Sequence, residues 1–423
     1  MTTIEPHVSS RHSATTRVLK IGMIGIGVGG AEILPAMEAM PTVQLVAGAD
    51  VVPETLERFA ARYEGVRTYG SAADLCRDPE VEAVWISSPN RFHAEHAILA
   101  ARHGKHIVLE KPMAISLAEA QATVAAADAA GVKLLAGHTM SFSPPIRAMH
   151  SIIQSGRLGK LRAINVWAYS DWMLRPRTPD ELDINQGGGI PFRQGPHQVD
   201  TVRLLGGGLV RSVRAQVGQW MPERPIPGYY AAFLEFEDGT PAIISHNGYG
   251  YFLGAELVPW GEDRQRYTLE ERLHIRAAMR AGTRNETEAK QELRIGGKQE
   301  TEVFSRSEHK AWVPHDLGVV IASCERGDVR QSPYGVYVHD DSGKHDIDTT
   351  GDSTTGVGQR RAELQELYDA VVSGTPLWHD GRWGLATLEV CLAMMTSARE
   401  RKEIRLEHQV PVHPAYAAEL VVP

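Results

Sequence analysis

The sequence predicts an α/β protein of two domains, the first built on a doubly wound parallel sheet and the second an α+β domain with a large, mostly antiparallel open sheet. Three observations carry this prediction. A glycine-rich turn separates an apolar run from a helical pattern near the N-terminus, strand and helix patterns then alternate to about residue 140, and beyond residue 160 longer strand patterns follow one another. A chain of 423 residues also exceeds one ordinary core.

The glycine-rich turn, Gly25-x-Gly27-Val28-x-Gly30, follows a β-branched apolar run over residues 18–24. Gly25 permits a tight turn, Gly27 lets the backbone approach a pyrophosphate, and Gly30 lets a helix pack closely on the strand, so that the amides near Val28 face the phosphates. A turn in this context is more specific than glycines alone. It predicts a Rossmann domain that binds a dinucleotide.

The acid after the second strand indicates which dinucleotide is bound. A helix is expected over residues 31–40 and a strand over residues 43–49, followed by Asp50, twenty residues past Gly30. A carboxylate there accepts hydrogen bonds from ribose hydroxyls but repels a 2′-phosphate, and residues 51–53 offer no cationic side chain. We therefore expect NAD rather than NADP.

The rest of the first domain continues the alternation. Further strands are expected at residues 66–69, 81–87, 106–109 and 133–136, with a helical turn from Ser71 and helices at residues 92–103 and 116–130. Ligands of doubly wound sheets lie beyond the carboxyl ends of the strands. Because Asn90, Lys111 and His138 follow three of these strands, we expect them to face one crevice.

The second domain is expected to pair its strands mostly antiparallel. Its strands are predicted at residues 161–169, 210–219, 230–236 and 241–247 and near Val336, and its last helices at residues 359–373 and 382–400. Residues 261–310 are highly charged with mixed signs and include a predicted helix at 268–281. We interpret them as a surface insertion that forms a lid or an oligomer contact. The predicted divisions are a disordered tail at 1–17, an NAD-binding domain at 18–140 and a domain for substrate and oligomer contacts at 141–423.

Composition excludes several classes of function. The 44 Lys and Arg against 52 Asp and Glu leave a net charge of −8 without a long basic block, so nucleic acid and anionic membranes are not expected partners. No secretory h-region or membrane-spanning apolar run is found, and three well-separated cysteines fit reduced thiols in a cytoplasm. No metal site is predicted, because adjacent residues in His339-Asp340-Asp341 would point to opposite faces of a strand.

Several motifs occur in one order along both domains. They are the glycine turn, Ser88-Pro89-Asn90 with His93, Glu110-Lys111-Pro112, and Gly187-Gly188-Gly189 followed by Gly195-Pro196-His197-Gln198-Val199-Asp200. This arrangement resembles the glucose-fructose oxidoreductase/inositol dehydrogenase (Gfo/Idh/MocA) family over residues 19 to about 406. The resemblance implies an NAD site that includes Ser88, Asn90, His93, Glu110 and Lys111. It also implies an open sheet that packs a substrate pocket against the nicotinamide and often builds homodimers or homotetramers.

Two residues are candidates for catalysis. Lys111 matches the family lysine that lies beside the nicotinamide and the substrate hydroxyls, and His197 matches the active-site histidine of the family. Alcohol oxidation needs one group to take the hydroxyl proton while hydride leaves, and a nearby cation stabilises the alkoxide-like charge. We expect His197 to be the base and Lys111 the cation, since a neutral imidazole titrates near working pH.

The sequence departs from the family at Arg193. Sugar- and inositol-type members usually carry an aspartate four residues before the histidine, and this chain has Arg193 there. A guanidinium so close to His197 would keep the imidazole neutral but would remove its orienting partner. We expect Asp200, one helical turn further on, to replace that partner in part.

Arg193 also bears on the substrate, because a guanidinium fork matches a carboxylate better than a neutral polyol. Arg175 and Arg177 lie upstream, after Trp172 and Met173, and with Arg193 they suit a flat, carboxylated ring. Asp200 and His138 complete the expected substrate-binding residues.

These segments, together with Cys324-Glu325-Arg326-Gly327-Asp328-Val329-Arg330-Gln331-Ser332-Pro333, look like the phthalate 4,5-cis-dihydrodiol dehydrogenase branch of the family. That resemblance implies oxidation of 4,5-dihydro-4,5-dihydroxyphthalate to 4,5-dihydroxyphthalate in aromatic acid degradation. One alternative is an NAD-dependent sugar, inositol or glycoside dehydrogenase in which Arg193 is only structural. Another is a dinucleotide-binding regulator without turnover, against which the presence of both Lys111 and His197 argues.

Overall fold

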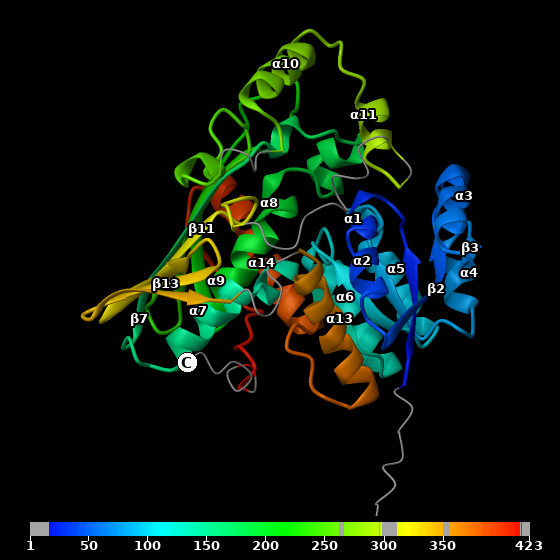
Figure 1. Ribbon diagram of the computed structural model, residues 1–423, viewed down its shortest axis with the longest axis horizontal. Coiled ribbons are helices and arrows are strands. Elements are labelled where there is room, and N and C mark those ends of the chain that lie inside the picture. The colour runs from blue at the N-terminus through cyan, green and yellow to red at the C-terminus, as the bar shows by residue number, and fades with distance from the viewer. Residues whose placement is uncertain are drawn as a thin grey trace, which may run out of the picture.

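The computed structural model describes residues 17–261, 266–295, 297, 311–349, 356–414 and 416. Two sheets organise these residues, one in the blue and cyan part of the chain and one in the green and yellow part (Figure 1). The expected tail at 1–17 lies outside the described residues except for Arg17, and so do parts of the charged insertion.

The first sheet has six strands in the order β3-β2-β1-β4-β5-β6. They are β1 (Leu19–Ile24), β2 (Val43–Ala49), β3 (Arg67–Tyr69), β4 (Ala83–Ile86), β5 (His106–Glu110) and β6 (Leu134–Gly137). All neighbours pair parallel. The order reverses between β1 and β4, where doubly wound sheets bind their ligands. The prediction of a Rossmann sheet is confirmed.

The helices of this domain are α1 (Val28–Ala31), α2 (Leu34–Glu38), α3 (Pro53–Arg62), α4 (Ala72–Arg77), α5 (His93–Arg102) and α6 (Leu117–Ala130). Ser71 and Ser116 cap α4 and α6 by accepting hydrogen bonds from the backbone amides of Asp74 and Glu119. The single helix expected at 31–40 is wrong. The chain instead forms two short helices, α1 and α2, because Pro35 lacks the amide proton that would continue α1 into α2.

The second sheet has nine strands in the order β14-β13-β12-β11-β7-β10-β9-β8-β15. They are β7 (Leu161–Tyr169), β8 (Val210–Gly218), β9 (Tyr229–Phe236), β10 (Pro241–Asn247), β11 (Val319–Cys324), β12 (Gly327–Gln331), β13 (Gly335–Asp340), β14 (Gly343–Asp348) and β15 (Ile404–Arg405). Only β10 and β7 pair parallel among these neighbours. The mostly antiparallel sheet is confirmed, although β11, β12, β14 and β15 were not predicted.

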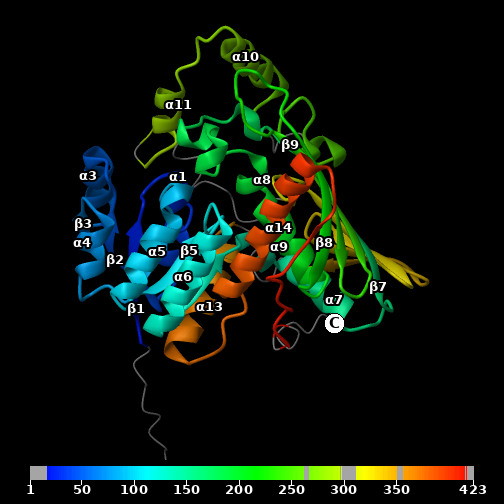
Figure 2. The ribbon, with the colours of Figure 1, turned by 180° about the vertical axis from the view of Figure 1, so that it is seen from behind.

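One face of this sheet is covered by helices and the other is open. Figure 2 shows α7 (Pro144–Gln154), α9 (Gly195–Leu205) and α14 (Gly381–Glu400) lying against the strands. The outer face exposes Trp167, Phe233 and Ile243, which are between 45% and 47% exposed. Burial alternates along β7 because successive side chains of a strand point to opposite faces.

The last long helices join the domains. Leu385 and Leu388 of α14 pack in the core of the first sheet, as do Leu364 and Leu367 of α13 (Gly356–Val372). Within the described part of the chain, every helix is too short or too polar to cross a bilayer.

The charged insertion contributes α10 (Leu269–Arg280) and α11 (Glu286–Glu292), which lie at the top of Figure 1. The helix expected at 268–281 is confirmed. Thr268 caps it and exchanges hydrogen bonds with Glu271 in a capping box.

Candidate active site

The glycine turn is built as a close approach between backbones. Gly25 has a φ of 91°, and a Cβ added to Gly30 would lie 2.4 Å from the carbonyl oxygen of Gly25. By contrast, a Cβ at Gly27 would meet nothing within 4 Å, so the backbone beside α1 borders open space. This geometry fits a pyrophosphate.

Asp50 is held against this turn. Its Oδ2 accepts a hydrogen bond from the amide of Ile26 at 2.9 Å, and its Oδ1 accepts one from the amide of Val52 at 2.9 Å. Each carboxylate oxygen keeps a lone pair, so the acid can still accept a ribose hydroxyl. The neighbouring Val51 is 85% exposed and offers a 2′-phosphate no cation.

The loop after β4 is fastened through its polar side chains. The ring nitrogens of His93 lie 2.7 Å from the carbonyl oxygens of Pro112 and Ser88, and the Ser88 hydroxyl lies 2.9 Å from a ring nitrogen of His96. Asn90 donates to the carbonyl of Gly187 at 2.9 Å. His93 therefore positions the loop of Lys111, and Asn90 connects the two domains.

Lys111 follows β5 and points toward the second domain. Its Nζ donates to the carbonyl of Arg193 at 3.1 Å. Burial lowers the pKa of Lys111 to about 8, Glu110 opposes this shift, and the Arg193 charge adds to it. An ammonium with such a pKa can change its proton near neutral pH.

Next to Lys111 lies an acid cluster, which we define as Glu110, Arg360, Glu363 and Thr139. Arg360 of α13 lies 2.7 Å from Glu110 and 3.2 Å from Glu363, and the Thr139 hydroxyl donates to Glu363 at 3.2 Å. Burial raises the pKa of Glu363 to about 7. The sequence analysis missed Arg360 and Glu363. Their only signal was a charged pair with i,i+3 spacing in a predicted amphipathic helix.

His197 is placed on α9 and is 7% exposed. Burial, followed by the charge of Lys111, holds the pKa of His197 well below its usual range, so the ring is neutral and can accept a proton. We expected Arg193 to be the cause of this neutrality. Instead, its guanidinium turns away to Asn90 and Glu181.

Asp200 does not take the orienting role that we expected. Its Oδ1 accepts a hydrogen bond from the indole of Trp383 on α14 at 2.6 Å, and Nδ1 of His197 has no partner among the described residues. Asp200 lies three residues beyond His197 on α9, and its side chain points toward α14 rather than toward the His197 ring.

His138 directly follows β6 and is 2% exposed. Burial lowers its pKa to about 4, while Asp200 opposes the shift. Neither of its ring nitrogens has a partner among the described residues, and neither does Oδ2 of Asp200. Buried polar atoms of this kind usually meet water or a polar ligand.

The three candidate arginines are all paired with carboxylates of the protein. Arg175 lies 2.6 Å from Asp316 and 2.9 Å from Asp171. Arg177 stacks 3.6 Å over the ring of Trp172 and, like Arg193, contacts Glu181.

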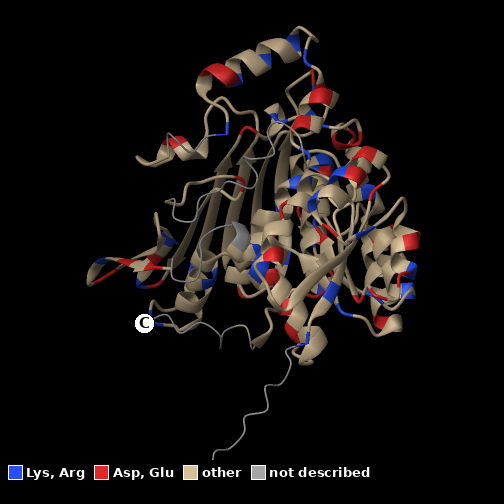
Figure 3. Ribbon diagram, turned by 45° about the vertical axis from the view of Figure 1, so that its right-hand side comes forward, with Lys and Arg blue, Asp and Glu red and all other residues tan. Residues whose placement is uncertain are grey.

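The sequence analysis missed Glu181 and Asp316. Neither acid belongs to a recognisable motif, and Asp316 lies more than 100 residues from its partner. Over the described chain as a whole, Lys and Arg are interspersed with Asp and Glu (Figure 3).

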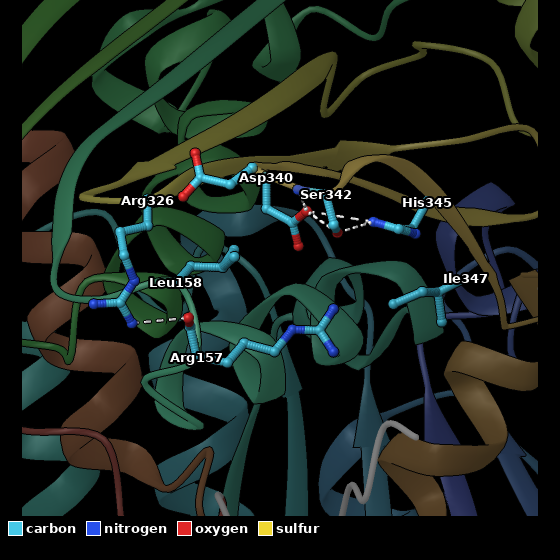
Figure 4. A pocket seen from close by; sticks show the side chains of 8 residues that line it. Arg157, Leu158, Arg326, Asp340, Ser342, His345 and Ile347 are labelled. Carbon is cyan, nitrogen blue, oxygen red and sulfur yellow. Dashed lines mark hydrogen bonds and ion pairs between the residues drawn. The ribbon is translucent and has the colours of Figure 1, made fainter.

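A separate surface hollow of about 550 Å³ lies at the far end of the second sheet (Figure 4). It is lined by Arg157, Leu158, Arg326, Asp340, Asp341, Ser342, His345 and Ile347. Asp340, Ser342 and His345 hydrogen-bond to one another there. The hollow contains none of the residues that the sequence analysis selected for chemistry.

Comparison with known proteins agrees with this geometry. Residues 19–138 match a model described as an oxidoreductase family with an NAD-binding Rossmann fold, and residues 146–252 match the GFO/IDH/MocA C-terminal domain. The 1-carboxy-3-chloro-3,4-dihydroxycyclohexa-1,5-diene dehydrogenase of Comamonas testosteroni is 32% identical over 396 residues, which cover 90% of this chain and 95% of that protein.

Solved structures show the same two domains. One from Bordetella bronchiseptica RB50 has a TM-score of 0.82 at 34% identity, covering 92% of this chain and 100% of that one. A levoglucosan dehydrogenase in complex with NADH and levoglucosan has a TM-score of 0.71 at 18% identity, covering 92% of this chain and 99% of that one. The turn, the acid and the two-domain frame make this chain an NAD-type oxidoreductase, and it belongs to the GFO/IDH/MocA family.

Proposed function

We propose that this protein is a dehydrogenase of carboxylated cis-dihydrodiols, with 4,5-dihydro-4,5-dihydroxyphthalate as substrate and 4,5-dihydroxyphthalate as product, in aromatic acid degradation. The observation that carries the proposal is Arg193. It replaces the aspartate of sugar-type relatives, and its carbonyl is the acceptor of Lys111. The relative from Comamonas testosteroni, whose name describes a carboxylated diol ring, supports the same substrate class.

Each residue has a role in this proposal. Arg193 holds a ring carboxylate, and Lys111 polarises a ring hydroxyl through its ammonium. His197 receives the hydroxyl proton, because its buried ring is neutral. The guanidinium of Arg193 also donates to Asn90 and Glu181, but its side chain is 25% exposed and keeps further N–H groups for a carboxylate. Arg175 and Arg177 pair with Asp316 and Glu181 and are less exposed, so they act on the substrate through their charge.

NAD supplies the hydride acceptor when it is bound. Gly27 leaves room for its pyrophosphate and Asp50 presents its carboxylate to the ribose, while Asn90 and His93 shape the loop beside it. Loss of hydride and proton from the diol leaves a hydroxy-enone that tautomerises to a catechol. Aromatisation makes the overall oxidation favourable.

The test is absorbance of the reduced nicotinamide with NAD and four candidate substrates. These are the phthalate cis-dihydrodiol, a non-carboxylated cis-dihydrodiol, myo-inositol and glucose. We expect fast reduction with the phthalate diol alone. Faster reduction with myo-inositol or glucose would overturn the proposed substrate and favour the sugar or inositol alternative.

We also propose that the protein is a cytoplasmic homodimer or homotetramer. The open face of the second sheet, with Trp167, Phe233 and Ile243 exposed, would pair with another copy. The described cysteines are free, which fits a reducing compartment. Light scattering of the purified protein tests the assembly, and a mass of one chain at micromolar concentration would contradict it.

A further inference from the structure

The insertion around α11 contacts both domains. Lys290 lies 2.9 Å from Glu181, and Glu286 pairs with Arg224 of the second domain at 2.6 Å. Past the end of the helix, Ile295 is buried in a core cluster of the first domain, and its carbonyl accepts a hydrogen bond from Arg58 on α3 at 3.4 Å. The insertion therefore spans from one domain to the other beside the candidate site.

Glu181 is the point where the insertion meets the site. It is 5% exposed, and it contacts Arg193 at 2.8 Å, Lys290 at 2.9 Å and Arg177 at 3.2 Å. One carboxylate carries one negative charge, so it cannot neutralise three cations. Arg193 and Lys290 occupy different oxygens, Oε1 and Oε2, which brings both cations to one small region.

The neighbouring ion pairs do not relieve this imbalance, because their own positive and negative charges balance. We define the cationic cluster as three groups of described ion pairs that hydrogen bonds of Arg177 and Arg224 link to one another. The groups are Arg175 with Asp171 and Asp316, then Arg177, Arg193 and Lys290 with Glu181, and finally Arg224 and Arg284 with Glu286. It contains six cations and four carboxylates. Arg193 is the most exposed of its cations, at 25% of its side chain, and Lys290 is at 18%. An excess of positive charge that is partly removed from water is unfavourable in free energy, so an anion bound here would be stabilised.

The cluster reaches the chemical centre through Arg193. The backbone of that residue accepts the hydrogen bond of Lys111, and its side chain reaches Glu181 and hence Lys290. A ring whose hydroxyl lies at Lys111 would therefore find the surplus positive charge of Arg193 and Lys290 on the side of the insertion.

We propose that Lys290 of α11 and Arg193 form a subsite for a carboxylate of the substrate, so that the insertion determines specificity for anionic rings. This inference rests on the proposed function and adds to it Lys290, a specificity residue from a segment that the family motifs do not contain. An ammonium has three donors, and Lys290 donates to Glu181 at 2.9 Å and to the carbonyl of Pro176 at 3.5 Å, which leaves one for a ligand.

The test measures binding rather than turnover. Phthalate is titrated against the full-length protein in complex with NADH, with the fluorescence of Trp172, beside Arg177, as part of the signal. Catechol is the uncharged control ligand. The variants are Lys290→Met, Lys290→Arg and the matched control Arg280→Met on α10, whose side chain is 62% exposed.

We expect the dissociation constant of phthalate to rise about tenfold or more in Lys290→Met, and that of catechol to change less than about twofold. Lys290→Arg should restore most of the affinity, and Arg280→Met should behave as the wild type. Phthalate binding that is indifferent to Lys290, or catechol binding that weakens equally, would overturn the inference, as would a wild type that binds phthalate no better than catechol.

The two proposals fail in different ways. If no dihydrodiol reduces NAD but phthalate binding depends on Lys290, the proposed function fails and the subsite stands. If the phthalate diol is oxidised but phthalate binding ignores Lys290, the subsite is overturned and the function stands.

Discussion

The acid cluster next to Lys111 and the cationic cluster around Glu181 are built from the same groups in opposite proportion. In the acid cluster, Glu110 and Glu363 share one guanidinium, that of Arg360. In the cationic cluster, the single carboxylate of Glu181 forms ion pairs with three cations, those of Arg177, Arg193 and Lys290. A surplus of buried carboxylate is relieved by keeping a proton, whereas guanidinium keeps its charge near neutral pH. Burial lowers the pKa of Lys290 to about 8, so this ammonium is still mostly charged at pH 7 and the surplus of positive charge favours an anion. The first cluster therefore adjusts Lys111, and the second is suited to a ligand.

The largest expected effect is at Lys111, where the two clusters meet. Lys111→Met removes the cation that donates to the Arg193 carbonyl, so kcat should fall about a thousandfold, a larger loss than the weakening of NADH binding. Steady-state kinetics and NADH titration measure both. Lys20→Met, which removes an exposed ion pair with Glu80, is the control. A kcat within tenfold of the wild type would remove Lys111 from the chemistry.

Glu181→Gln should be next, because it leaves three cations around a neutral amide. We expect a loss of about 3–5 kcal/mol in the free energy of unfolding at pH 7. The surrounding cations hold the pKa of Glu181 well below its usual range, so this stability is present above the unfolded pKa and is lost as pH falls.

Urea denaturation at pH 7, and in steps down to about pH 3, measures the effect of Glu181→Gln and its decrease with falling pH. Glu288→Gln, at an exposed acid of α11, is the control. An equal effect of the two variants would mean that Glu181 does not hold the cationic cluster together.

Glu363 should contribute a pH dependence of stability opposite in sign to that of Glu181, and Glu363→Gln should abolish it. The native pKa of Glu363 is raised to about 7, so the wild type loses stability as pH rises from about 4.5 to 7, by up to about 3 kcal/mol. The amide cannot ionise, so the variant should not show this loss.

Urea unfolding at pH 5 and pH 7.5 compares Glu363→Gln with the wild type, with Asp369→Asn of α13 as the control. A wild type whose stability does not fall relative to Glu363→Gln over this range would show that Glu363 is ionised throughout.

Arg193→Ala should have the smallest effect, and it tests whether the cationic cluster binds a carboxylate of the substrate. We expect KM for the phthalate diol to rise about tenfold with a smaller change in kcat, and KM for a non-carboxylated diol to stay near the wild-type value. Arg91→Ala is the control, since that exposed arginine contacts the side chains of Gln186 and Phe92 and no carboxylate among its described partners. An unchanged KM for the carboxylated diol would contradict the role of Arg193.

Local patterns in the sequence determined much of the frame. The glycine turn, Asp50 after β2 and the alternation of strands and helices depend on neighbours within a few residues, and so does the cap at Thr268. The prediction of a single helix at 31–40 was wrong for a local reason as well, because Pro35 interrupts the helix.

Only the tertiary structure decided which charges meet. Arg360 reaches Glu110 from 250 residues away, and Lys290 reaches Glu181 across 109 residues. The partner of Asp200 proved to be Trp383 rather than His197, because the packing of α14 on α9 sets where that carboxylate points. Periodicity and capping are encoded within one or two helical turns, whereas the match between distant charges depends on how the sheets and helices pack. For that reason the sequence alone named Lys111, His197 and Arg193, and the fold supplied the partners that set their charge.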